Sequence, residues 1–257
     1  MAEFETVRRT GAGVRTAQVD EGLRAHMNKV YGLMAMAMVI TGAAAWAVAG
    51  LAVSDVPTQY QIGADTFLTS FGVAIYASPL KWVIMLAPLA VVFGMSAGIN
   101  RLSEAGLQGV FWLFSALMGL SLSSIFLVFT GYSIVQVFLV TAIAFAGLSL
   151  WGYTTKKDIS AWGSFLVMGV IGLIVAMLVN IFLASPAVTF AISAIGVLIF
   201  AGLTAYDTQK IKTTYLEMRG TEGEAYLGKA AIMGALSLYL DFINMFMFLL
   251  QLFGNRN

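Results

Sequence analysis

Seven long apolar segments dominate this chain and restrict what it can fold into. Each is close to the ~20 residues that a helix needs to cross a bilayer, and they cover residues 30–53, 82–100, 109–129, 133–152, 161–183, 187–206 and 230–253. Only 11% of the 257 residues are charged, too few to cover the surface of a soluble domain of this size. The sequence therefore predicts an all-α integral membrane protein, a bundle of seven transmembrane helices surrounded by the lipid bilayer.

A polar, basic region precedes the first apolar segment. We predict two parts, an N-terminal tail over residues 1–29 and a single transmembrane domain over residues 30–257. The first apolar segment has 24 residues, whereas the apolar core of a signal peptide has about 7–15. The only histidine, His26, falls in the tail, and there is no cysteine. The pattern therefore argues against histidine metal clusters, Ser-His-Asp catalysis and thiol chemistry inside the membrane.

The distribution of basic residues predicts the orientation. Residues 67–80 form a short apolar segment of 14 residues, a length typical of a re-entrant or interfacial segment and not of a span. With seven spans and the N-terminus inside, twelve basic residues fall on the inner side, and only Lys81 and Arg256 fall outside. This bias predicts an N-in, C-out topology.

Two connections between spans are very short. They comprise residues 130–132 and 184–186. Short links join antiparallel neighbours, so we expect the third span to pack against the fourth and the fifth against the sixth.

Two aspartates interrupt the last two apolar segments. Asp207 closes the sixth, and Asp241 lies 11 residues into the seventh. A charge at the centre of a membrane helix costs roughly 3 kcal/mol on insertion scales, so such residues are usually functional. Each aspartate shares a helix face with mostly small or polar residues. They are Ser193, Gly196 and Thr204, together with Phe200, in the sixth span, and Gly234, Ser237, Asn244 and Gln251 in the seventh. We expect the two faces to meet or to line a common cavity.

The aspartates allow two interpretations. In the first, Asp207 and Asp241 share a proton and act as a pH-sensitive latch, closed when protonated and open to a cation when ionised. In the second, each is satisfied separately by a backbone amide or by a basic residue such as Lys210 or Lys212. If both spans begin at the same inner boundary, Asp241 lies up to ~15 Å deeper than Asp207.

Arg101 ends the second span, which contains Pro88. It precedes Glu104 at the i+3 spacing of a helix. One interpretation is an arginine that extends to the membrane surface. The other is a counter-charge that reaches Asp207 from the inner side and locks the mouth of a pore.

Three sequence runs resemble the Bax inhibitor-1 family, also called the transmembrane Bax inhibitor motif family, in a bacterial version. They are Phe200-Ala-Gly-Leu-Thr-Ala-Tyr-Asp207-Thr-Gln, Ser237-Leu-Tyr-Leu-Asp241-Phe-Ile-Asn244 and residues 147–155. The resemblance covers residues 25–255. It implies a seven-helix fold with the last helix in the middle and a calcium-permeable leak controlled by pH through an acidic pair. Carried onto this chain, the pair is Asp207 and Asp241, and the latch arginine is Arg101.

We therefore expect a pH-sensitive calcium leak in the cell inner membrane and not an enzyme. Its partners are Ca²⁺ and protons, without nucleic acid or a tightly bound cofactor, and the two carboxylates hold Ca²⁺ transiently. The expected gating residues are Asp207, Asp241 and Arg101. The residues expected to line or support the pore are Thr204, Tyr206, Ser237 and Asn244.

Two alternatives remain open from the sequence. The first is a regulator of membrane protein quality control or cell death, which binds protein partners through the N-terminal tail or the link over residues 208–229. The second is an intramembrane aspartyl protease, which also uses two aspartates on adjacent spans. Its second motif is Gly-x-Gly-Asp, whereas this chain has Leu238-Tyr-Leu-Asp241.

Overall fold

The computed structural model describes residues 2–62, 67–219 and 224–256, and the side chains of all of these except residues 2–20, 224 and 225. The elements run in the order α1 (Ala2–Ala52), β1 (Val53–Ser54), β2 (Phe67–Leu68), α2 (Ser70–Gly72), the π-helix η1 (Val73–Ala77), α3 (Leu80–Gly98), α4 (Glu104–Leu122), α5 (Ile125–Val128), α6 (Gly131–Thr154), α7 (Trp162–Leu183), α8 (Pro186–Met218) and α9 (Glu224–Phe253). Within the described residues, seven helices are long and apolar enough to cross a membrane. The predicted all-α, seven-span membrane fold is confirmed.

Short polar residues begin several of these helices. Ser103 accepts a hydrogen bond from the backbone N–H of Gly106 at the start of α4, and Thr130 accepts one from Ser133 at the start of α6. Such N-caps satisfy backbone donors that have no partner within the helix. Ser185 caps α8 in the same way, with a proline as the next residue.

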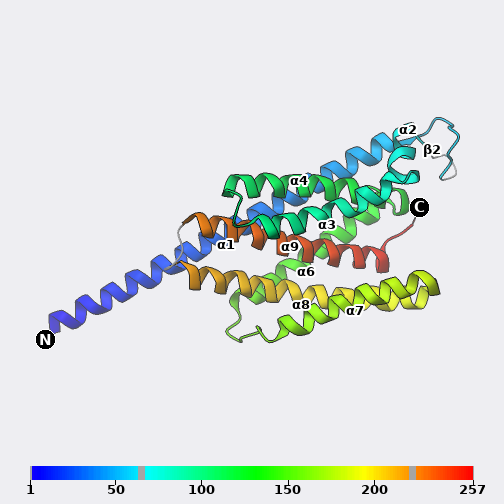
Figure 1. Ribbon diagram of the computed structural model, residues 1–257. Helices are drawn as coiled ribbons and strands as arrows, with labels where there is room; N and C mark the ends of the chain where they lie inside the picture. The colour runs from blue at the N-terminus through cyan, green and yellow to red at the C-terminus, as the bar shows by residue number, and fades with distance from the viewer. Residues whose placement is uncertain (1, 63–66, 220–223, 257) are drawn as a thin grey trace.

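The last helix is the most buried of the seven spans. In its most apolar stretch, 72% of the residues are buried, and no other span exceeds 33%. Helices α1, α4, α6 and α8 all pack against α9, and Figure 1 shows α9 running between α1, α3 and α4 on one side and α7 and α8 on the other. The N-in, C-out orientation stays a prediction.

One of the two predicted helical hairpins forms. Helices α7 and α8 pack against each other, as the link over residues 184–186 predicted. The predicted pairing of the third and fourth spans is wrong, because α4 packs on α1, α3 and α9, whereas α6 packs on α8 and α9. The helix breaks at Ser123 and Ser124, and the short α5 leads to Thr130, whose N–H donates to the carbonyl of Asn255. The connection therefore passes the end of α9 instead of forming a tight turn.

Residues 67–80 do not form a span. Strand β2 pairs with β1 just after α1, and Thr69 donates to the carbonyl of Leu51 and caps α2. The π-helix η1 follows, and its Tyr76 donates to the hydroxyl of Ser123 over 2.7 Å. This segment therefore covers the ends of α1 and α4, as a non-spanning segment of that length predicted.

Two predicted boundaries differ from the structure. Helix α1 is continuous across residues 29 and 30, so the predicted tail and the first span are one helix. Helix α8 continues to Met218 and α9 begins at Glu224, so the predicted link over residues 208–229 is mostly helical. The polar residues of this extension are satisfied locally: Gln209 accepts from the backbone N–H of Ile159, and Lys212 donates to the carbonyl of Tyr153.

Candidate functional site

The faces of α8 and α9 that carry the aspartates pack against each other. A Cβ atom built on Gly234 of α9 would lie 3.0 Å from the side chain of Ile211, and one built on Gly196 of α8 would lie 2.6 Å from the ring of Phe248. Both glycines therefore allow close approach of the two helices.

These contacts fix the register of the two antiparallel helices. Counting from them along both chains, Thr204 lies opposite Asp241, and Asp207 lies opposite Leu238. The aspartates are thus offset by about three residues, or ~5 Å along the helix axis. An offset of ~15 Å would require both helices to begin at the same inner boundary. That condition does not hold, because α8 continues to Met218 and Asp207 does not lie at its inner end.

Asp241 is buried inside the protein. Its exposed fraction is 4%, and its Oδ2 atom is buried without a hydrogen-bond partner among the described residues. An ionised carboxylate is costly to bury without a partner, so this site can hold a charge only if a cation arrives or the helices move.

Asp207 lines a cavity of about 260 Å³ that ends one helical turn before Asp241. Ser237 and Gly234 of α9 line the same cavity. The charged or titratable side chains that line it with Asp207 come from three helices: His26 of α1, Lys210 of α8 and Tyr226 of α9. A cavity with several charged and polar side chains in its largely apolar lining therefore leads to the first aspartate and approaches the second.

His26 is a residue of this cavity that was not predicted from the sequence. Its exposed fraction is 8%, and its ring lies 4.9 Å from the ring of Tyr215. The sequence does contain a pattern that indicates the burial of this part of α1. Leu23, Met27 and Val30 have the i, i+4, i+7 spacing of a buried helix face. All three are buried, so the buried face of α1 begins well before the apolar segment does.

The predicted supporting residues have different surroundings. Thr204 is fully buried and donates to the carbonyl of Phe200 in its own helix. Asn244 likewise donates to the carbonyl of Leu240. The ring of Tyr206 packs where a side chain on Gly163 of α7 would be, so the structure does not bring Tyr206 to the aspartates.

The structure does not bring Arg101 to Asp207. Arg101 is exposed in the turn after α3, and no ion pair joins it to Asp207 in the described part of the chain. Glu104 begins α4 and pairs with Lys29 of α1, with 2.6 Å between Oε1 and Nζ. The latch role of Arg101 stays a prediction.

Buried hydroxyl groups join α9 to two other helices. The Tyr239 hydroxyl and the Thr41 hydroxyl are 2.7 Å apart, and Thr41 also donates to the carbonyl of Ser115. Tyr239 and Ser115 are fully buried. This network holds α9 against α1 and α4, two residues before Asp241.

The described residues do not group three histidine, aspartate or glutamate side chains as a metal site. Two carboxyl groups and nearby hydroxyl oxygens are hard ligands that suit Ca²⁺, but they are too few for a tight cage. The site can therefore hold a cation only briefly.

Comparison with known proteins identifies the family. The family described as "Inhibitor of apoptosis-promoting Bax1" (Bax1-I) matches residues 23–257. A protein of Caulobacter vibrioides is 46% identical over 93% of this chain and 91% of its own length. The inner membrane protein YbhL of Escherichia coli is 44% identical over 91% of this chain and 93% of its own length.

The name of the E. coli relative and the seven apolar helices agree with the predicted location in the inner membrane. The match begins at residue 23 and so includes His26, all seven spans and both aspartates. This chain belongs to the family of inhibitors of apoptosis-promoting Bax1.

Proposed function

We propose that this protein is a pH-sensitive, calcium-permeable leak gated by Asp207 and Asp241. The observation that carries the proposal is the buried Oδ2 atom of Asp241, which has no partner among the described residues and lies one turn beyond the cavity lined by Asp207 and Ser237. An unpaired acid in the most buried helix of the bundle destabilises the fold, so its presence favours a functional role.

The gating step follows from the offset of about one turn between the two aspartates. Two carboxyl groups on neighbouring helices, offset by about one turn in a medium of low dielectric constant, interact strongly and titrate as a pair. With the proton bound, the pair is compatible with the tight packing of α8 on α9. When the proton leaves, repulsion between the carboxylates favours separation of the helices and attracts a cation.

The permeation path begins at the cavity and passes Ser237 to reach Asp241. Beyond Asp241, the buried side chains of α9 are apolar, with Met245, Phe246 and Leu250 among them. An apolar constriction of this kind stops ions until it widens. The structure is thus compatible with a closed state, in which the polar path stops at the second aspartate.

Calcium flux into proteoliposomes, measured between about pH 5 and pH 8, tests the proposal. We expect wild-type flux above that of protein-free liposomes and rising as the pair ionises. We expect the Asp207→Asn and Asp241→Asn variants to lose this pH dependence. Absence of calcium flux in the wild type would refute the leak, and unchanged pH curves in both variants would refute gating by the pair.

Asp158→Asn is the matched control. Asp158 lies outside the spans, and hydrogen bonds from Ser160 lower the pKa of its carboxyl group. It therefore stays ionised throughout the tested range. We expect this variant to keep the wild-type pH curve.

A further inference from the structure

A groove runs between α1 and α6. It consists of two adjoining cavities of about 490 and 450 Å³, which share Tyr31 and Phe145 as lining residues. The lining spans residues 24–39 of α1 and residues 138–153 of α6. At 1.5 Å per residue, the groove is therefore ~22 Å long. It lies apart from the cavity at Asp207, with which it shares no lining residue.

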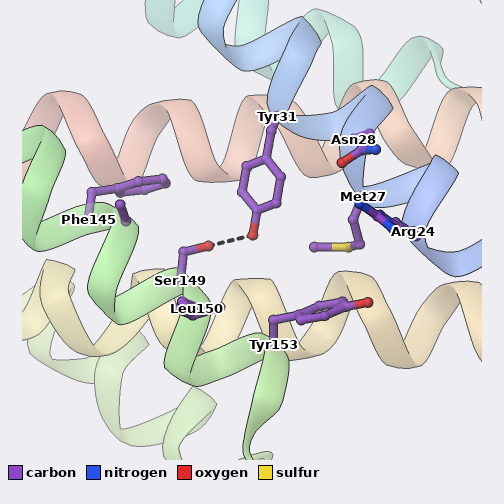
Figure 2. Close-up of a pocket in the computed structure, with 9 residues that line it drawn as sticks. Arg24, Met27, Asn28, Tyr31, Phe145, Ser149, Leu150 and Tyr153 are labelled. Carbon is purple, nitrogen blue, oxygen red and sulfur yellow. Dashed lines mark hydrogen bonds between the residues drawn. The ribbon is translucent and has the colours of Figure 1, made fainter. Parts of the chain in front are cut away.

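The two ends of the groove differ in chemistry. Arg24, Asn28 and Tyr153 line one end, and Figure 2 shows Arg24 and Asn28 on α1 at the end away from Phe145. The rest is apolar and includes Met34, Met38, Phe138, Ala142, Phe145 and Phe242. A ligand that fits this groove has one charged end and a long apolar part.

The polar end carries a positive charge. Arg24 is exposed and forms no ion pair or hydrogen bond with the residues that the structure describes. The ammonium group of Lys212 lies close behind this end, where it donates to the carbonyl of Tyr153 and lies 5.3 Å from the centre of that ring. An anionic group is the complement of this end, and a phosphate matches the fork of an arginine.

The groove is narrow. Tyr31 of α1 reaches Ser149 of α6 across it, with 2.5 Å between the two hydroxyl oxygens (Figure 2). Ser149 in turn bonds to the Thr208 hydroxyl of α8 over 2.9 Å. A gap that one tyrosine and one serine can bridge is too narrow for a helix with its side chains, whose diameter is about 10–12 Å. A single alkyl chain is thin enough to lie in the groove along the outer side of this contact.

The groove opens on the lipid-facing surface of the bundle. Val39 and Leu150 line it, and their exposed fractions are 66% and 63%. Both lie in helices that are apolar enough to cross the membrane. Lipid chains are therefore the medium that meets this opening, and the groove is longer than the ~15 Å depth of one hydrocarbon leaflet.

We propose that this groove binds an anionic phospholipid, with its phosphate at Arg24 and one acyl chain along α1 and α6. The charge at one end, the apolar lining and the opening toward the bilayer each match one part of such a lipid. The groove shares no lining residue with the cavity at Asp207, so this proposal does not rest on the calcium leak.

Photo-crosslinking in nanodiscs tests the proposal. The probe is phosphatidylglycerol with a photoreactive group near the end of one acyl chain, and mass spectrometry of peptides locates the adducts. We expect adducts concentrated on residues 24–39 and 138–153. Adducts spread evenly over the lipid-facing helices would overturn the proposal, because they would indicate ordinary boundary lipid.

Two variants separate the roles of the groove and the charge. Ala146 lines the groove, so Ala146→Trp fills it and is expected to reduce adducts there at least fivefold. The matched control is Ala144→Trp, which changes another exposed residue of α6 outside the groove lining and is expected to keep the wild-type yield. Equal losses in both variants would overturn the proposal.

Arg24→Gln tests the head group and does not change the packing of the bundle. In the wild type we expect phosphatidylglycerol to compete for the groove about fivefold better than phosphatidylcholine, the value typical of one basic residue near the membrane surface. Arg24→Gln should abolish this preference, whereas Arg219→Gln should keep it. The assignment of the phosphate to Arg24 would be overturned if the wild type showed no preference for phosphatidylglycerol. It would also be overturned if the preference survived Arg24→Gln.

Discussion

Asp207 and Ser237 line the same cavity from neighbouring antiparallel helices, and Asp241 follows Ser237 by one helical turn. A proton or cation that enters this cavity therefore meets the first carboxyl group before it reaches the second. In the proposed path, Ser237 lies level with Asp207, at the end of the cavity nearer to Asp241.

Ser237→Leu should block this path. The larger apolar side chain would fill the end of the cavity beside Asp207 and remove the hydroxyl group that a cation can use there. We expect calcium flux in proteoliposomes to fall to the level of protein-free liposomes. Ser96→Leu, on an exposed face of α3, should leave the flux unchanged, and equal effects of both substitutions would contradict this role for Ser237.

Gly152→Ala should destabilise the contact between α6 and α8. A Cβ atom at Gly152 would collide with the backbone of Ala205, so the helices would have to separate. Overpacking of this kind costs about 1–3 kcal/mol, which a lower thermal unfolding temperature in detergent would report. Gly147→Ala is the control, because a Cβ there meets no atom within 4 Å. An unchanged unfolding temperature for Gly152→Ala would contradict the prediction, because it would show that α6 and α8 leave room for a methyl group at this position.

Tyr239→Phe should weaken the attachment of α9 to α1. The substitution keeps the ring and removes the hydroxyl group that lies 2.7 Å from Thr41. Hydrogen bonds between membrane helices contribute about 0.6 kcal/mol on average and up to about 1.7, and we expect a loss of stability in this range. The Tyr132 side chain is 78% exposed, so Tyr132→Phe should have no effect on unfolding; a loss as large as that of Tyr239→Phe would contradict the prediction.

The ion pair between Lys29 and Glu104 should contribute little to stability. Its two side chains are 44% and 34% exposed, and such pairs typically contribute 1 kcal/mol or less. A double-mutant cycle with Lys29→Gln and Glu104→Gln should give a coupling energy below about 1 kcal/mol that decreases as salt is added. A larger coupling that does not respond to salt would indicate that the pair is effectively buried.

Much of the fold could be predicted from the sequence because hydropathy reports directly on contact with lipid. The seven spans, the non-spanning segment over residues 67–80 and the pairing of α7 with α8 all followed from apolar length and link length. The packing of α4 on α1 and α3, and of α6 on α8, could not be predicted in this way. The length of their link does not reveal the helix break at Ser123 and Ser124, or the hydrogen bond that ties Thr130 to Asn255.

The candidate site was predicted less completely, because hydropathy does not report where helices end. Thr208 and Ile211 are buried in a part of α8 that lies beyond the apolar segment, and His26 is buried in α1 before its apolar segment begins. Neighbouring parts of the protein cover these two stretches and satisfy their polar groups. Their residues therefore need not be apolar, and hydropathy does not detect them. The depth of Asp207 and the composition of its cavity therefore required the structure.

The central claim is that Asp207 and Asp241 share one proton whose release opens the path. Infrared difference spectroscopy between about pH 5 and pH 8 can follow the protonated carboxyl group directly through its C=O stretch. We predict one carboxyl band that disappears over the same pH interval in which calcium flux rises, and that is absent or shifted in both Asp207→Asn and Asp241→Asn. A band that neither substitution alters, or that disappears outside the interval of the flux change, would contradict the account.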